Sequence, residues 1–439
     1  MSRPPDLGTR GDGRFRVVDA ARIVDCLVRN LWPYEAAADP GRATADAAAL
    51  LERWIVEGLP FSVVDGERRF DPCEACNFPL AAWLRDGDPV FLTRQVASSR
   101  RMVREMQARI TAATRFALTF RREFNLHGIA AGTPVRLRLP VPVDGDSAAA
   151  LRSTHDAAVP DAIELRSPGR LELRFAMPRP AQPSLAIEVT ADLAGTASGT
   201  PLAADAPDAP YDTGSEEYRL HTRPREGLIR VTPAVVELAA ALAGPRARPA
   251  RIVRSIWDHF VKRMHVGFIH YDELDPGDPL AAVIARGWCD CHTGSALFAA
   301  LARARGIPAR IVTGAVLYPV APSQHSWLEV LLPPLGWLPV DIFGAFLAAR
   351  RQDDTEWSGR FLGHLDPRLT TQRLPVTFTG AVGVAVPDAW YILQRLAKRR
   401  DGGGTELTLG CLDERAWLLR DTIRVAACTG PADPAGGGA

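Results

Sequence analysis

The spacing of apolar residues predicts helices in the first quarter of the chain. Between about residues 15 and 112, apolar side chains recur every three to four positions, as they do on one face of an α-helix. The clearest case is the stretch from Ala43 to Leu59, and a second predicted helix runs through Arg101 to Ile110. We therefore expect an N-terminal helical region.

The spacing then changes to strict alternation. Val135, Leu137 and Leu139 alternate with arginines, and the same pattern recurs further along, up to about residue 195. Alternation is typical of strands with one buried and one solvated face, as in an antiparallel sheet or sandwich. Residues 113–195 are thus predicted to form a small β domain.

Beyond residue 195 a segment rich in Gly, Pro, Ala and Asp predicts a linker. Helical spacing returns between Ile252 and Met264, and another predicted helix extends from Cys291 to Arg305. The sequence Gly306-Ile307-Pro308 ends that helix, because glycine favours the C-terminal turn and proline cannot continue it. Alternating residues then predict strands that lead up to Val340.

These patterns predict an α+β chain of several parts. The parts are a helical region at 1–112, a β-sandwich-like domain at 113–195, a linker at 196–233, a mixed core at 234–348, and a C-terminal extension at 349–439 with a β-hairpin and a disordered tail.

Composition excludes some classes of partner. The 439 residues include 52 Lys plus Arg and 51 Asp plus Glu, which gives a net charge of +1. This balance favours neither nucleic acid nor an anionic membrane as a partner. No apolar run is long enough to span a bilayer, and the first twenty residues lack the apolar segment of a secretory signal. We therefore expect a cytoplasmic protein.

The chain has seven cysteines, and an odd number in a large chain that we expect to be cytoplasmic, where thiols stay reduced, argues against a disulfide framework. Cys291 stands where a loop turns into a helix. The positive end of the helix dipole and the N–H groups there stabilise a thiolate, which is the nucleophilic form, and those N–H groups are also candidates to bind an oxyanion. His325 opens one predicted strand and Asp341 closes the next, so a hairpin would bring their ends side by side. An Asp beside a His fixes its tautomer and stabilises its cation, which completes a Cys–His–Asp unit.

The stretch around these three residues resembles the core of the transglutaminase-like superfamily of papain-like thiol enzymes. The matching pieces are Gly287, Cys291, the Gly-Ile-Pro-Ala-Arg sequence at 306–310, His-Ser-Trp-Leu-Glu-Val at 325–330, and Val340-Asp341. The resemblance is strong over about 95 residues, and a strand like the one beginning at Gly132 precedes the core in many bacterial members. It implies a papain-like core, in which a helix carrying the Cys packs on an antiparallel sheet carrying the His and Asp.

The resemblance also implies roles for individual residues. Cys291 would be the nucleophile, His325 the base and Asp341 the orienting carboxylate. Cys289 competes for the first role, but the separation between Cys291 and Gly306 is the one found in the family. No cofactor and no metal are implied, since nothing resembles the calcium sites of animal transglutaminases.

Other candidates have plainer interpretations. Tyr271 and Trp288 are candidates for substrate contact, although such aromatics are more often packing residues. For His364 and Arg368, which follow the three residues in sequence, a surface charge is favoured over a place lining the cleft. A zinc site built from Cys73 and Cys76 with the Cys289–Cys291 pair is disfavoured, because structural zinc sites usually use two CxxC-like pairs and the metal would consume the nucleophile.

The sequence thus predicts a cysteine enzyme that forms a thioacyl intermediate on an amide, peptide or thioester carbonyl. Water would resolve it in a peptidase or amidase, and an amine would resolve it in an acyltransferase. The expected partners are a peptide, a protein or small acyl and amine substrates, and the sequence leaves the oligomeric state open. One alternative is a catalytically idle scaffold for protein–protein interaction, and another is a redox or zinc protein.

Overall fold

The computed structural model describes most of the chain. The described residues are 17–86, 90–109, 114–126, 130–143, 148–155, 162–167, 170–181, 183–194, 198–203, 205–270, 274–275, 277–318, 320, 322–348, 355–373, 395–401, 404–410 and 417–429. The predicted disordered tail lies outside them. Within these ranges, no helix combines the length and the apolar character needed to cross a membrane.

The N-terminal region is mainly helical. Its helices are α1 (Ala20–Leu31), α2 (Pro33–Ala38), α3 (Pro40–Val56), α4 (Pro72–Asp86) and α5 (Val90–Arg109). Apolar residues on the helix faces, among them Leu27, Leu51 and Trp54, form a core of their own. The strands β1 (Val18–Asp19), β3 (Glu67–Phe70) and β2 (Ser62–Val64) add a small antiparallel sheet, too short in each strand to produce an alternation signal.

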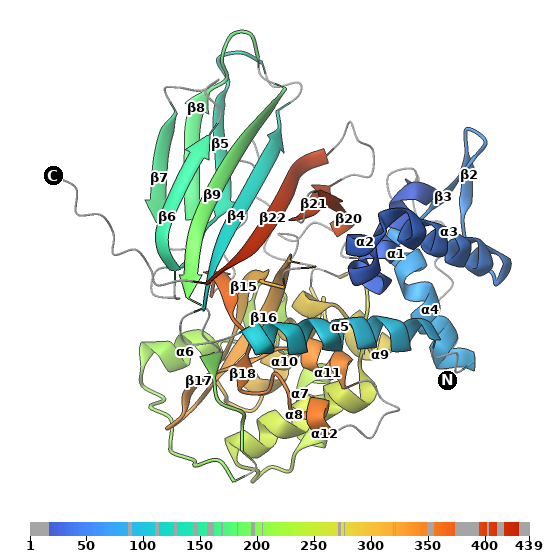
Figure 1. Ribbon diagram of the computed structural model, residues 1–439. Coiled ribbons are helices and arrows are strands. Elements are labelled where there is room, and N and C mark those ends of the chain that lie inside the picture. Colours follow the sequence, from blue (N-terminus) through green and yellow to red (C-terminus); the bar gives the residue numbers. More distant parts are fainter. Residues whose placement is uncertain are drawn as a thin grey trace.

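A β domain follows, seen at the upper left of Figure 1. One sheet has the order β20-β21-β22-β4-β9-β6 and the other β5-β8-β7. Their inner faces share one apolar core, with Phe116 and Ile187 from the first sheet and Leu137 and Leu173 from the second. The strands are β4 (Thr114–Asn125), β5 (Pro134–Pro140), β6 (Ala148–His155), β7 (Ile163–Ser167), β8 (Arg170–Ala176), β9 (Ser184–Ala194), β20 (Arg395–Asp401), β21 (Gly404–Gly410) and β22 (Trp417–Thr429).

The late strands β20, β21 and β22 belong to this sheet and not to a separate extension. β21 pairs with β22 in an antiparallel manner, where the sequence predicted a hairpin, and β22 then pairs with β4 along its length, with Ile423 opposite Phe120. Figure 1 shows β22, in red, beside β4. The β domain therefore combines residues near 113–195 with residues that follow the core in sequence.

The segment predicted as a linker packs against the core. It contains β10 (Ser198–Gly199), α6 (Glu216–Thr222), β11 (Arg225–Glu226) and β12 (Ile229–Arg230). Leu228 and Ile229 are buried. Glu226 forms a buried ion pair with Arg303 at 2.9 Å, which ties the segment to the helix of the predicted nucleophile. These anchors lie beyond the Gly- and Pro-rich stretch that predicted the linker, and only a few apolar residues make the contact.

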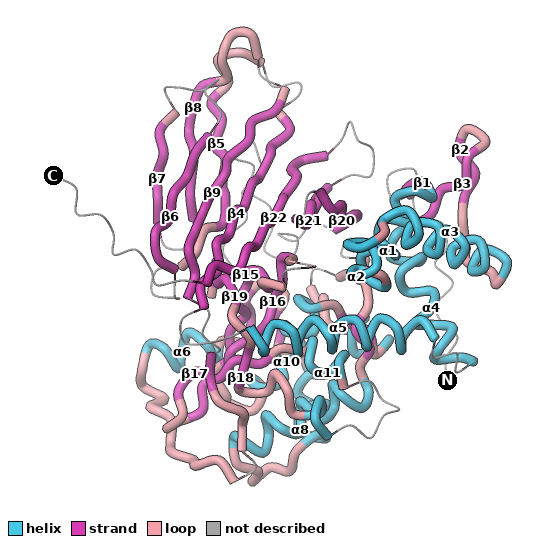
Figure 2. Tube along the Cα trace, in the orientation of Figure 1, coloured by secondary structure: helices cyan, strands magenta, loops and turns pink. Residues whose placement is uncertain are grey.

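The mixed core surrounds one buried helix, α10 (Cys291–Arg303), which lies against the antiparallel sheet β17-β16-β15-β19. Residues 296–302 of this helix are fully buried. The remaining elements are α7 (Pro233–Leu242), α8 (Pro249–Arg263), β13 (His265–Val266), α9 (Ala281–Arg286), β14 (Trp288–Cys289), β15 (Ala309–Val316), β16 (Ser323–Leu332), β17 (Gly336–Val340), α11 (Phe343–Leu347), α12 (Thr355–Ser358), β18 (His364–Leu365) and β19 (Arg368–Gln372). Figure 2 shows α8, α10 and α11 together at one side of the strands β16 and β17.

The core confirms the predicted α+β class and the order of its elements. α8 covers most of the apolar stripe that begins at Ile252, and α10 begins at Cys291 as expected. Residues after 348, assigned by sequence to the extension, also contribute, since β19 pairs with β15 at the edge of the core sheet.

We predict that Ile423→Ala destabilises the β domain by about 2–5 kcal/mol, the usual cost of a cavity at a buried aliphatic side chain. Ile423 is 2% exposed and lies in the shared apolar core, whereas the neighbouring Arg424 on the same strand is exposed. Urea unfolding of Ile423→Ala and of the matched control Arg424→Ala measures the difference. Equal midpoints for the two variants would show that β22 is not an integral strand of the sheet.

Candidate active site

The start of α10 is fixed by a capping box. The Asp290 carboxylate accepts hydrogen bonds from the backbone N–H groups of His292 and Thr293 at 3.1 and 2.8 Å, and Asp290 N–H donates to Thr293 Oγ1 at 3.0 Å. Such reciprocal bonds determine the residue at which a helix begins, so they place Cys291 in its first turn. They also engage two of the N–H groups that the sequence offered as oxyanion donors, and those two amides are therefore not available for that role.

The chain enters this helix through a left-handed turn. Gly287 ends α9 with a φ of 66°, a conformation that side chains disfavour. The two residues of β14 follow, and β13 pairs with them in a parallel manner. Gly287 in the sequence motif thus has a structural role: its positive φ ends α9 and turns the chain just before Cys291.

His325 and Asp341 lie side by side, as the hairpin predicted. β16 and β17 pair in an antiparallel register that places Leu328 opposite Val340. His325 Nε2 is 2.9 and 3.0 Å from the two carboxylate oxygens of Asp341. Phe343 N–H donates to Asp341 Oδ1 at 2.9 Å and holds the carboxylate in place.

His325 also forms a hydrogen bond with Cys291, so the structure brings all three predicted residues together. Since Asp341 engages Nε2, Nδ1 is the ring nitrogen that faces the thiol. Burial alone lowers the pKa of His325, but the charges of Asp341 and Cys291 and hydrogen bonds to both raise it to about 9. A raised pKa favours the imidazolium, which is the partner that a Cys291 thiolate would need.

Cys289 occupies a different environment from Cys291. It is fully buried in β14, and its Sγ lies 3.6 Å from the His265 carbonyl oxygen. Burial, with the nearby charges of Asp290 and Cys291, raises the pKa of the Cys289 thiol well above its ordinary value. A thiol held in this way is a poor nucleophile, whereas Cys291 is partly exposed.

Arg368 is a site residue that the sequence interpretation missed. Surface charge was favoured, but its side chain is 3% exposed and Nη1 lies 2.5 Å from Asp341 Oδ2. Burial raises the pKa of Asp341, yet His325, Arg368 and the hydrogen bonds around it outweigh burial and hold that pKa below its usual range. No local pattern signals this contact, because Arg368 lies 27 residues beyond Asp341 and reaches it through the pairing of β19 with β15.

A second buried carboxylate adjoins Arg368. Tyr318 donates a hydrogen bond to Asp366 Oδ2 at 2.6 Å. Burial raises the pKa of Asp366, although Arg368 and the Tyr318 hydroxyl partly offset that effect. Arg368 thus faces two acidic side chains, and Tyr318 supplies Asp366 with a neutral donor.

Of the two aromatic candidates, Trp288 lies within the described residues and Tyr271 does not. Trp288 packs against Leu80 and Val96 of the N-terminal helices and lies 5.9 Å from the His265 ring, which is a packing environment. Its contact with substrate stays a prediction. Tyr271 lies outside the described residues.

The cysteine pairs do not form the four-thiolate site that was considered. Among the described residues, one group has the geometry to hold a metal ion, and it contains Cys73 but neither Cys289 nor Cys291. The proposed nucleophile is therefore not in a metal-binding cluster.

Residues 236–342 match the sequence model of the transglutaminase-like superfamily. This part of the chain is a transglutaminase-like domain. It contains Cys291, His325 and Asp341. No curated protein matches the sequence.

Solved structures similar to the chain include that of a "putative cysteine protease" from Cytophaga hutchinsonii, which is 15% identical with a TM-score of 0.43, over 72% of this chain and 99% of that one. The periplasmic domain of TgpA from Pseudomonas aeruginosa is 16% identical with a TM-score of 0.27, over 55% of this chain and 91% of that one.

We predict that Cys291 is alkylated faster than the other thiols, at pH values well below ~8, where ordinary thiols are protonated. Limiting iodoacetamide between about pH 5 and about pH 9, followed by peptide mass analysis, measures the rates. In His325→Ala the reaction of Cys291 should require the pH of an ordinary thiol, about 8.5, because the imidazolium is gone. His364→Ala is the matched control. Preferential labelling of Cys289 would show that Cys291 is not the reactive thiol.

We predict that Arg368→Gln lowers the free energy of unfolding by about 3–5 kcal/mol, because it leaves the Asp341 carboxylate buried without one of its two cationic partners. Urea unfolding is the measurement. The control is Arg68→Gln, which removes a solvent-exposed pair with Glu52 and should cost no more than about 1 kcal/mol. A similar loss in both variants would mean that Arg368 does not neutralise Asp341.

Proposed function

We propose that the transglutaminase-like domain is a thiol enzyme that transfers acyl groups through a thioester on Cys291. The observation that carries this proposal is the position of His325, which contacts Cys291 and Asp341 at once. Such an arrangement prepares a nucleophile and a proton donor in one site. The superfamily match at residues 236–342 supports the same chemistry.

Acylation begins from the thiolate–imidazolium pair. The Cys291 sulfur attacks the carbonyl carbon of an amide or thioester, and a carbon–sulfur bond forms while the carbonyl oxygen takes the negative charge. As the tetrahedral intermediate collapses, the bond to the leaving group breaks. An amine leaving group takes its proton from the His325 imidazolium, and a thiolate leaving group takes the same proton and departs as a thiol. The products are a thioester on Cys291 and a neutral His325.

Deacylation returns the enzyme to its starting state. Neutral His325 removes a proton from water or from an amine, which attacks the thioester carbonyl. The carbon–sulfur bond breaks and the Cys291 thiolate leaves beside the imidazolium. Asp341 supports both stages by fixing Nε2, so that Nδ1 always faces the sulfur. Arg368 keeps Asp341 ionised and therefore acts through that carboxylate as a positioning residue.

The acceptor decides whether the enzyme is a hydrolase or an acyltransferase. Water gives a peptidase or amidase, and a primary amine gives a new amide. The same three residues serve both outcomes, because either acceptor needs only a base at Nδ1 and a leaving thiolate. The proposed donors are amides and thioesters. In both, the thiolate attacks the carbonyl carbon and an amine or a thiol leaves.

We predict that the chain releases the leaving group of a glutaminyl peptide or of a small acyl thioester, and that Cys291→Ala and His325→Ala each lower the rate at least about a thousandfold. The double variant should be no slower than either single variant, since the two residues act as a unit. Ammonia or thiol release measures turnover, and the product masses with and without a primary amine distinguish hydrolysis from transfer.

His364→Ala serves as the control and should keep wild-type turnover. Full turnover in Cys291→Ala would exclude the proposed mechanism. If the wild type releases nothing while Cys291 still labels selectively, these donor classes are excluded, and if selective labelling is lost as well, the domain is better described as a scaffold.

A further inference from the structure

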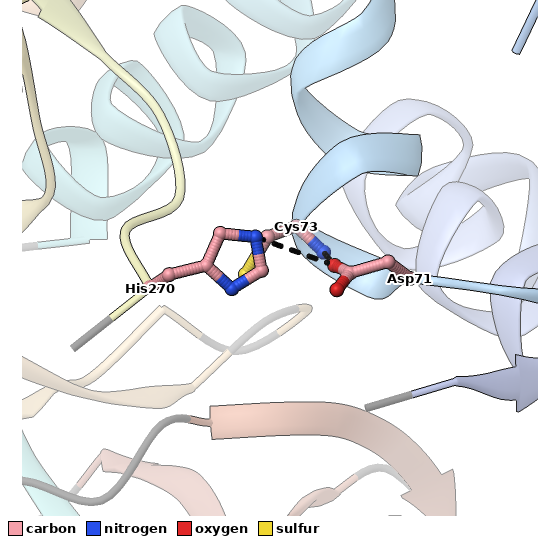
Figure 3. A group of neighbouring side chains, drawn as sticks. All are labelled: Asp71, Cys73 and His270. Atoms are coloured by element: carbon pink, nitrogen blue, oxygen red, sulfur yellow. Dashed lines mark hydrogen bonds and ion pairs between the residues drawn. The ribbon is translucent and has the colours of Figure 1, made fainter. Parts of the chain in front are cut away.

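A second group of nucleophilic and metal-ligating side chains lies away from Cys291, where the N-terminal helices meet the core. Asp71 and Cys73 stand at the start of α4, and His270 follows β13 in the transglutaminase-like domain. Figure 3 shows the three side chains converging from these two segments. Cys73 is 1% exposed and His270 is 7% exposed, so the group is largely withdrawn from solvent.

The distances within this group are compatible with one bound ion. One ligand atom from each of Asp71, Cys73 and His270 lies within 4.8 Å of the other two. His270 Nε2 is 3.6 Å from Asp71 Oδ1 and 3.6 Å from Glu74 Oε1, which is longer than an ordinary hydrogen bond. Two ligands on a tetrahedral ion with bonds of about 2.0–2.3 Å are separated by roughly 3.3–3.8 Å.

The local fold holds the group in place. Asp71 Oδ1 accepts hydrogen bonds from the N–H groups of Cys73 and Glu74 at 2.8 and 3.2 Å, which starts α4 and sets Cys73 in its first turn. Cys76 follows one helical turn later, with its Sγ 3.4 Å from the Sγ of Cys26 on α1. The CxxC sequence therefore places a further thiol on the same helix.

The segment that carries His270 is also clamped to α4. Asn77 donates a hydrogen bond to the Phe268 carbonyl at 3.0 Å and accepts one from Phe268 N–H at 2.9 Å. The same segment is bonded to β14, since Gly267 N–H donates to the Cys289 carbonyl oxygen at 2.8 Å. An ion bound by both Cys73 and His270 would thus hold the N-terminal helices against the strand that leads into Cys291.

The charges favour a cation at this point. Asp71 and Glu74 each place a carboxylate oxygen 3.6 Å from His270 Nε2, and the Cys73 thiol belongs to the same group. Two carboxylates and a thiol thus surround a single imidazole. A divalent ion would neutralise them more fully than one proton does, and thiolate, imidazole and carboxylate together are ligands that zinc accepts.

We propose that Asp71, Cys73 and His270 bind one Zn²⁺ ion, which joins the N-terminal helical region to the transglutaminase-like domain. The fourth position of a tetrahedral site is left to a ligand other than these three side chains. The ion is structural, because its ligands come from two separate parts of the chain and none of them belongs to the Cys291 site. It differs from the zinc site disfavoured by sequence, which required Cys289 and Cys291.

The test uses the full-length chain, reduced with a phosphine and stripped of metal by a chelator. Titration with Co²⁺ should give the visible bands of a tetrahedral ion and a thiolate-to-cobalt charge-transfer band in the near ultraviolet, and Zn²⁺ should abolish both. Elemental analysis after zinc loading should find about one ion per chain. Cys73→Ser and His270→Gln should each weaken Zn²⁺ binding at least about tenfold.

Cys289→Ala and Cys291→Ala are the controls. Cys289 is as buried as Cys73 but lies outside the group, and Cys291→Ala removes the proposed nucleophile, so both should bind the metal as the wild type does. If the wild type binds no Co²⁺ or Zn²⁺, His270 is simply a cation between two carboxylates and the proposal is wrong. Wild-type affinity in folded Cys73→Ser would also overturn it. Because the cobalt spectrum of the wild type needs neither turnover nor a folded variant, its result is independent of the proposed acyl transfer.

Discussion

The arrangement of the site depends on the burial of one negative charge. Asp341 has no exposed surface, and an ionised carboxylate removed from water is costly unless cations and donors surround it. His325, Arg368 and the Phe343 N–H satisfy that requirement. The same contacts fix the imidazole, raise its pKa and direct its other nitrogen toward Cys291.

This requirement explains why distant segments of the chain meet at the domain. Asp341 follows β17, His325 lies on β16 and Arg368 opens β19, so three strands of one sheet each contribute a charged group. β19 belongs to residues that lie beyond the superfamily match at 236–342. The matched domain therefore contains the three predicted catalytic residues but not Arg368, the second cation beside Asp341.

The N-terminal helices have a comparable relation to the domain. Arg100 on α5 donates to the Leu347 carbonyl, and Asn77 on α4 is hydrogen-bonded to the segment before His270. These contacts lie on the side of β13 and β14, the strands that precede Cys291. Groups from outside the domain thus contact both Asp341 and the segment that leads to Cys291, the predicted nucleophile. The proposed metal ion between Cys73 and His270 would strengthen the second of these contacts.

The sequence by itself determined the features that depend on neighbours in the chain. Helical and alternating periods located α8, α10 and the hairpin, and the separation of His325 from Asp341 within that hairpin predicted their contact, because strand pairing brings nearby residues together in a defined register. Only the tertiary structure decided the contacts between remote segments. Arg368 on Asp341, β22 on β4 and His270 on Cys73 each depend on how separate elements pack, and no periodicity or spacing encodes that packing. Cys73 and Cys76 were visible as a pair from the start, but the partners that give them a chemical meaning come from the fold.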